Sequence, residues 1–199
     1  GTAWASWQYA RRVTLPWAAL GPAVAAALLG ALAGAWAVTQ VPADGLKRAL
    51  PFVLLAVLVY TLARKDLGRT HAPRHAGRHE AGIAMAVGAV VGFYDGFFGP
   101  GTGSFFVFLL VRLLGYDFLH ASACAKLLNT ATNVSALGLF AWAGHVWWHI
   151  ALVMAVANVA GSLFGTRLAL KHGAGFVRGV FIVVVGALIA KTAWDAYLR

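Results

Sequence analysis

Long apolar runs separated by short polar connections dominate the hydrophobic pattern of this chain. A helix needs about 20 predominantly apolar residues to cross the hydrocarbon core of a bilayer. Residues 1–10 have the character of the end of an earlier helix. Further helices are predicted at about 15–38, 49–63, 118–142, 147–170 and 176–198. The pattern therefore predicts an all-α, polytopic membrane protein with about six to seven membrane segments.

One apolar stretch, residues 82–114, is interrupted by Gly99-Pro100-Gly101, which cannot continue a helix. Its two parts, about 82–98 and 102–114, are each short for a membrane span. We expect either a re-entrant hairpin or two short, tilted spans. Both arrangements return the chain to the side of the membrane that it left.

The clearly hydrophilic part of the chain is residues 64–80, which hold five Lys and Arg residues. Because cytoplasmic loops are enriched in these residues, the loop at 65–80 is predicted to be cytoplasmic. His71, His75 and His79 recur every four residues, a spacing that would form a metal-binding stripe on a helix. A proline and a glycine between them disfavour a helix. We therefore expect a solvated loop and no metal site.

A weak internal repeat links the two ends of the chain. Gly30-Ala-Leu-Ala-Gly34 matches Gly161-Ser-Leu-Phe-Gly165 at an offset of 131 residues. Inverted repeats are common in secondary transporters, although two unrelated small-residue packing motifs would give the same match. The repeats predict three parts: 1–64 as the end of a first repeat, 65–80 as the loop, and 81–199 as a second repeat.

Composition supports the membrane interpretation. The chain is 61% hydrophobic and 11% charged, whereas soluble domains average about 25% charged residues. The net charge of +10 would suggest nucleic acid in a soluble protein. Here the basic residues lie between apolar runs and no nucleic-acid-binding motif accompanies them. The lipid bilayer is thus the expected partner, without nucleic acid or a cofactor.

The start of the sequence is unusual. It begins with Gly1, its first methionine is Met85, and no signal peptide opens it. We therefore expect a fragment, or a chain trimmed at its N-terminus.

The helix break is the first candidate site. A helix starting near Thr102 would aim its N–H groups and the positive end of its dipole at whatever precedes it, which favours an anion. A packing kink between crossing helices is the alternative. The candidate substrate-binding residues at the break are Tyr94, Asp95, Gly99, Pro100, Gly101, Thr102, Gly103 and Ser104.

A polar stripe is the second candidate. Ser122, Lys126, Asn129 and Asn133 follow each other at spacings of four, three and four, which places them on one helical face. Lys126 could extend to the membrane interface, provide the cation for an anionic substrate, or act as counter-ion to Asp95. The spacing leaves these three roles open.

Asp95 and His120 are candidates for proton coupling. An isolated buried carboxylate favours its protonated form, so Asp95 could carry a proton, whereas pairing with Lys126 would keep it ionised. His120 lies near the cytoplasmic end and could relay protons, although an interfacial histidine is the simpler interpretation. The two residues would also be the acid and base of a membrane-embedded enzyme, which is the alternative to transport. A structural or accessory membrane subunit is a third interpretation.

The motifs GFYDGFFGPGTGSFF (92–106) and GYDFLHASACAKLLNTATN (115–133) resemble the second half of the sulfite exporter TauE/SafE family, also called TSUP transporters. The resemblance implies a bacterial inner-membrane transporter of two repeats that moves small, often sulfur-containing anions such as sulfite or sulfonates. It carries over Asp95, Gly99, Pro100, Gly101, Gly103, Lys126, Asn129 and Asn133 as family positions. It implies no catalytic residue, and leaves open the coupling proton or ion and a homo-oligomer.

Overall fold

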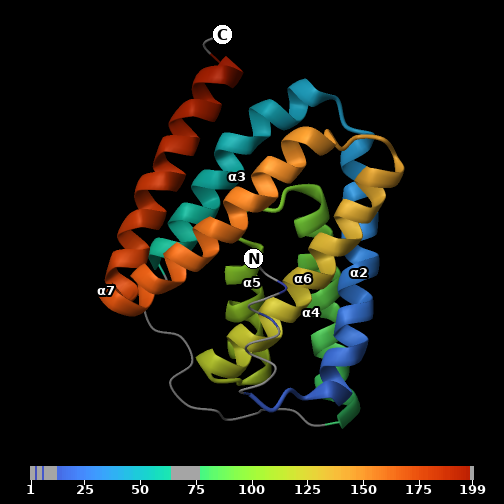
Figure 1. Ribbon diagram of the computed structural model, residues 1–199. Helices are drawn as coiled ribbons and strands as arrows, with labels where there is room; N and C mark the ends of the chain where they lie inside the picture. The colour runs from blue at the N-terminus through green and yellow to red at the C-terminus, as the bar shows by residue number, and fades with distance from the viewer. Residues whose placement is uncertain (1–2, 4–5, 7–12, 64–76, 198–199) are drawn as a thin grey trace. The chain divides into compact units, whose positions relative to one another are not determined.

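The computed structural model describes residues 3, 6, 13–63 and 77–197. Within these residues all regular secondary structure is helical, which confirms the all-α class. Figure 1 shows the helices in chain order from blue to red. Their bounds are α2 (Trp17–Thr39), α3 (Ala43–Ala63), α4 (Gly77–Phe97), α5 (Thr102–Leu109), the π-helical η1 (Leu110–Leu114), α6 (Phe118–Trp142) and α7 (Trp148–Tyr197).

The helices belong to two compact units. The α4 unit comprises residues 2–41 and 63–143, and so contains α2, α4, α5, η1 and α6. The α7 unit comprises residues 42–62 and 144–199 together with Gly1, and contains α3 and α7. The predicted division into repeats rests on internal similarity rather than on compactness, and it stays a prediction.

Small residues bring α2 and α4 into backbone contact. On α2, alanines at every fourth position are at most 1% exposed: Ala19, Ala23, Ala27, Ala31 and Ala35. On α4, a Cβ atom built at Gly96 would lie 2.1 Å from the Ala31 carbonyl oxygen. In the other direction, a Cβ atom at Gly34 would lie 2.1 Å from the Phe93 carbonyl oxygen. Gly34 therefore has the close-packing role that small residues take between membrane helices.

The helix α4 is longer than the pattern predicts. It begins at Gly77 rather than Gly82, and its 21 residues extend about 31 Å at 1.5 Å per residue. That is close to the thickness of the hydrocarbon core. The expectation that this part is short for a span was wrong, because the polar residues at 78–80 form the first turn of the helix instead of ending the loop. The histidines at 71 and 75 lie outside the described residues.

By length and composition, two helices in the described ranges are apolar enough to cross a membrane: α2 and residues Arg78–Phe97 of α4. The helical stretches Thr102–Leu114 and Trp148–Gly161 are apolar but shorter. The number of six to seven membrane segments therefore stays a prediction.

An antiparallel hairpin forms between α4 and the stretch α5–η1. Near the break, the Thr102 hydroxyl donates to Asp95 Oδ1 over 2.7 Å. At the other end, the Tyr116 hydroxyl donates to Glu80 Oε1 over 2.5 Å. These bonds span 15 residues of one arm and 14 of the other, so the arms match in length. The chain thus returns to the end where α4 began, as both predicted arrangements require.

Two other boundaries differ from the predictions, whereas α6 agrees with them at both ends. The helix α3 starts at Ala43, so residues 43–48 are helical although the predicted helix began at about residue 49. Pro42 accepts the first helical bonds through its carbonyl group, and Asp44 lies in the first turn, where a negative charge is favourable. The assignment of α7 runs unbroken through 171–173, where a connection was expected.

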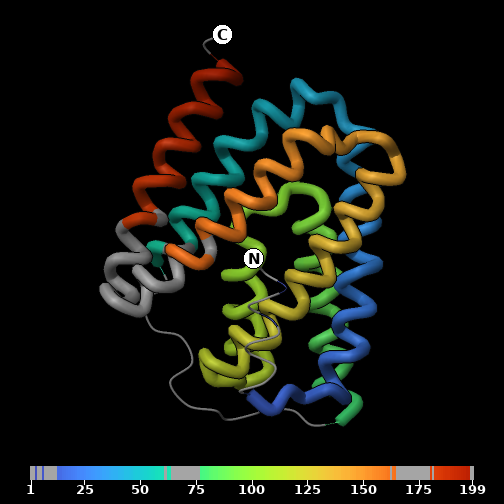
Figure 2. Tube along the Cα trace, viewed as in Figure 1, coloured from blue at the N-terminus to red at the C-terminus, as the bar shows by residue number. Residues whose placement is uncertain are grey.

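The described parts of α7 nevertheless follow two directions. In Figure 1 its first, orange part and its last, red part run in opposite senses, and Figure 2 shows the same course. The end of α7 contacts the start of α3, because the Tyr197 hydroxyl donates to the Arg48 carbonyl group over 3.0 Å. Both predicted segments lie within α7, which is one helix, so the boundary expected between them differs from the structure.

Candidate functional site

The break between α4 and α5 is built by glycines with positive φ. Gly99 and Gly101 have φ values of 85° and 83°, in the left-handed region where a side chain is strained. The Tyr94 carbonyl group accepts the Gly99 N–H over 3.2 Å, which closes the end of α4. The Tyr94 hydroxyl donates to the Pro100 carbonyl group over 2.6 Å and so ties the side chain of α4 to the turn. These contacts determine where α5 begins.

Asp95 joins three helices at this break. Its Oδ1 accepts from Thr102, the first residue of α5, and its Oδ2 accepts a short hydrogen bond from Thr132 in the middle of α6. Thr102 is 2% exposed and Thr132 is fully buried. The carboxyl group itself is half-buried. Asp95 therefore links α4 to α5 and α6 by hydrogen bonds and is also partly exposed.

This arrangement changes the prediction for the N-terminus of α5. The group that contacts Thr102 is the protein's own Asp95, so that side of the helix end is already occupied. Gly103 and Ser104 in the same first turn are exposed. An external anion would consequently meet the exposed side of the turn. The binding roles predicted for these residues stay predictions.

The polar stripe of α6 does not face Asp95. Lys126 and Asn133 are exposed, Asn129 is half-buried and Ser122 is buried. Lys126 precedes Thr132 by six residues, which is about 9 Å along a helix and a rotation of about 240°. The two side chains therefore lie on different faces. No ion pair joins Lys126 to Asp95 in the described residues, and the counter-ion role stays one of the three predictions for this lysine.

Thr132 is the residue that the sequence analysis missed. It follows Leu128 by four residues and precedes Ser135 by three, so it belongs to the buried face of α6. A signal was available, since two hydroxyl residues share the helical spacing of a core leucine.

His120 is separated from Asp95. The Asp117 side chain caps α6 by accepting the His120 backbone N–H over 2.8 Å, and its Oδ2 lies 2.7 Å from His120 Nδ1. Thr132, which contacts Asp95, lies 12 residues or about 18 Å further along the helix. A direct proton transfer between His120 and Asp95 is therefore not supported by this geometry.

The contact between Tyr116 and Glu80 gives a testable pH dependence. Tyr116, between η1 and α6, is 3% exposed. Burial, and then the hydrogen bond and charge of Glu80, raise the pKa of Tyr116 above its usual value of 10.0. A raised pKa contributes stability that is complete below the unfolded value of 10.0 and is lost as the pH rises above it.

We expect Tyr116→Phe to lower the free energy of unfolding by about 1.5–3 kcal/mol at neutral pH, because the bond to a charged acceptor is lost. The stability of the variant should also fall less steeply above pH 10 than that of the parent, because the titrating phenol group is gone. Thermal denaturation of both proteins as a function of pH measures this. If the stability of the variant falls above pH 10 as steeply as that of the parent, the role given to Tyr116 is contradicted.

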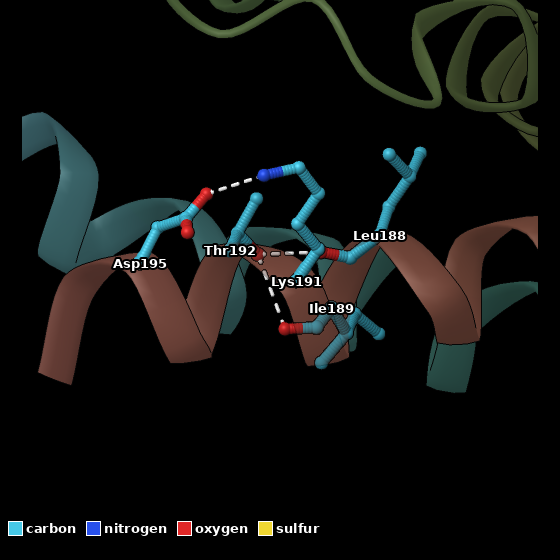
Figure 3. A network of polar contacts seen from close by, with 5 residues as sticks. All are labelled: Leu188, Ile189, Lys191, Thr192 and Asp195. Carbon is cyan, nitrogen blue, oxygen red and sulfur yellow. Dashed lines mark hydrogen bonds and ion pairs between the residues drawn. The ribbon is translucent and has the colours of Figure 1, made fainter. Parts of the chain in front are cut away.

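The α7 unit contains a polar network of its own, shown in Figure 3. Lys191 Nζ lies 2.7 Å from Asp195 Oδ2, with the two side chains 72% and 42% exposed. Thr192 donates to the carbonyl groups of Leu188 and Ile189 one turn earlier. Exposed pairs of this kind contribute little to stability, and the cluster supports no separate site. Over the described ranges, no group of three or more His, Cys, Asp or Glu residues could hold a metal ion.

The tightly packed helices and the apolar hairpin interrupted at Gly99–Gly101 are those of an integral membrane protein. The model of the sulfite exporter TauE/SafE family matches residues 1–192, and the chain belongs to this family. No solved structure gives a significant match.

Curated relatives are named as membrane transporters rather than enzymes. "Probable membrane transporter protein YfcA" of Escherichia coli K12 is 35% identical over 174 residues, which are 87% of this chain and 64% of the relative. "Probable membrane transporter protein ORF9" of Sinorhizobium sp is 35% identical over 195 residues, covering 98% of this chain and 74% of the relative. A "Probable membrane transporter protein" of Haemophilus influenzae is 30% identical over 167 residues, covering 84% and 65%. The chain thus spans about two thirds of the length of these relatives.

Proposed function

We propose that the protein is a secondary transporter of small anions in the bacterial inner membrane, with the basic loop at 65–80 in the cytoplasm. Sulfur-containing anions such as sulfite or sulfonates are the proposed substrate class. Membership of the TauE/SafE family supports this proposal, as do the names of the curated relatives. The lipid bilayer is the proposed environment, and a homo-oligomer is compatible with it.

The observation that carries the proposal is that Lys126, within α6 and away from its ends, is exposed. Lys126 lies eight residues after the start of α6, or about 12 Å along it. In the part of the chain that the structure describes, its ammonium group forms no ion pair. Ionisable residues at membrane depth are costly and usually mark a pathway for substrates or ions. A lysine provides a compact positive charge with three donors, which suits a small oxyanion.

Two amide side chains share the face of Lys126. Asn133 is exposed and Asn129 is half-buried, and each lies within two helical turns of the lysine. Their NH₂ groups can donate to anion oxygens, while the lysine balances the charge. An enzyme that uses Asp95 and His120 as acid and base is less favoured, because α6 separates them by about 18 Å.

A ligand-stability assay tests the anion site. We expect one class of anions, among sulfite, thiosulfate, sulfate, short sulfonates and carboxylates, to stabilise the purified full-length protein against heat. A ligand at about 100 times its dissociation constant adds roughly 2.7 kcal/mol. Lys126→Ala should lose this stabilisation because the cation is gone, whereas Lys126→Arg should keep part of it.

Lys191→Ala is the matched control, because Lys191 is an exposed lysine of another helix that pairs with Asp195. It should keep the full response to anions. Equal stabilisation of Lys126→Ala and the parent would show that the anion binds elsewhere. If no anion stabilises the parent, and Lys126→Ala is as stable as the parent, the alternative of a structural or accessory membrane subunit is favoured.

A further inference from the structure

We propose that Asp95 is a proton-binding site and that Thr102 and Thr132 hold the protonated acid between α4, α5 and α6. The proposal deepens the transport function, on which it rests for its physiological role, by naming the coupling ion as a proton. Its structural basis is a set of hydrogen bonds that has more acceptors than hydrogens.

Each of the two threonine hydroxyls faces two acceptors. Thr102 Oγ1 lies 2.7 Å from Asp95 Oδ1 and 2.6 Å from the Gly99 carbonyl oxygen. Thr132 Oγ1 makes a short contact with Asp95 Oδ2 and lies 3.0 Å from the Asn129 carbonyl oxygen. These four contacts have hydrogen-bond length, but a hydroxyl group has one hydrogen to donate. An ionised aspartate therefore leaves two of the four contacts without a hydrogen.

One proton on Asp95 changes this count. The protonated Oδ2 donates to Thr132 Oγ1, and the Thr132 hydrogen is then free to bond the Asn129 carbonyl oxygen. Thr102 continues to donate to Oδ1. Three of the four contacts now hold a hydrogen, and the acid carries no charge within the apolar helices. The proton comes from water that reaches the half-buried carboxyl group, and it returns to water when the acid ionises.

No cation replaces this proton in the described residues, where Asp95 forms no ion pair. The packed helices α2 and α5 contain no ionisable side chain. The ionisable groups on the neighbouring elements are Arg112 of η1 and His120, Cys124 and Lys126 of α6; those of α4 itself are Arg78, His79, Glu80 and Tyr94. The first three of α4 lie at least 15 residues, or about 22 Å, before Asp95 along the helix. In the described residues, the side-chain hydrogen bonds to the carboxyl group come from Thr102 and Thr132.

The site is coupled to the face of Lys126 by its geometry. When Asp95 ionises, the Thr132 hydrogen turns from the Asn129 carbonyl oxygen to the carboxylate, whereas Thr102 donates to Oδ1 in both states. Asn129 belongs to the face of Lys126. Gain or loss of the proton therefore changes a contact beside the proposed pathway.

Infrared difference spectroscopy tests the proton site without knowledge of the substrate. The full-length protein in lipid is titrated from acid to alkaline buffer, and we expect the carbonyl-stretch band of a protonated carboxylic acid to disappear. The other Asp and Glu side chains also contribute to this band, so the Asp95 component is the part that Asp95→Asn removes and the control Glu80→Gln retains. In the near-isosteric Thr132→Val this component should move to higher frequency, because the acid loses its acceptor. A band in Asp95→Asn equal to that of the parent would overturn the proposal.

The coupling ion is decided by two further comparisons. Replacing sodium by choline at constant pH should leave the band unchanged, and a change would identify a sodium site instead. In proteoliposomes, Asp95→Asn should lose the accumulation of radiolabelled sulfite against a gradient when it is driven by a pH difference. Accumulation equal to that of the parent would contradict proton coupling. If the parent moves no sulfite, the proposed substrate fails while the infrared result still decides the proton site.

Discussion

Gly96→Ala is expected to lower the free energy of unfolding by about 3 kcal/mol or more. The new Cβ atom would lie 2.1 Å from the Ala31 carbonyl oxygen, 2.8 Å from the Ala35 nitrogen and 2.9 Å from the Ala31 carbonyl carbon. All three atoms belong to the backbone, so no side-chain rotation relieves the clash. The two helices would have to separate.

Separation would affect the whole contact between α2 and α4. Gly88 and Gly92 approach the carbonyl groups of Ala23 and Ala27 in the same way, at 2.4 and 2.6 Å from a built Cβ atom. Dispersion contacts along such a surface weaken steeply with distance, and in lipid they are a main force between helices. We therefore expect most of the purified variant to be unfolded or aggregated at temperatures where the parent is stable.

Gly82→Ala is the matched control. Gly82 lies on the same helix α4, and a Cβ atom there would meet nothing within 4 Å. This change should be neutral or stabilise the protein by up to about 1 kcal/mol, since alanine is the better helix former. Thermal denaturation of the two variants in detergent measures the difference. Equal midpoints would show that the close contact at Gly96 is not formed.

Phe106→Ala is expected to cost about 3–5 kcal/mol of stability, the second large effect. Phe106 of α5 is fully buried and packs in a cluster with Leu110, Leu114 and Leu128, which are at most 2% exposed. Its removal leaves a cavity between α5 and α6 that surrounding backbone cannot fill. Because α5 begins at Thr102, loosening it should also weaken the hydrogen bonds of Asp95.

Phe118→Ala is the comparison for this prediction, because Phe118 starts α6 and is 55% exposed. It should change the midpoint of thermal unfolding little. The infrared band of Asp95 gives a second measurement, which should broaden in Phe106→Ala and stay sharp in Phe118→Ala. A Phe106→Ala protein as stable as Phe118→Ala would contradict the observed core.

The sequence alone determined the all-α class, the bounds of α6 and the break between α4 and α5. The bounds of α6 and the end of the stretch at Leu114 follow from local chemistry: apolar runs, the cap at Asp117 and the glycine after Leu114. Residues with positive φ at 99 and 101 were recognisable because only glycine adopts such a conformation without strain. The start of α4 was misplaced, since polar residues of a first helical turn look like those of a loop.

Only the tertiary structure decided which polar groups meet. Spacing along α6 identified Lys126 and the asparagines as one face, but whether Asp95 faces that stripe or Thr132 depends on how α4 and α6 are rotated about their axes. That rotation is set by glycine and alanine contacts between α2 and α4, and by Phe106 against α6. These contacts join residues far apart in the chain, so no local pattern contains them.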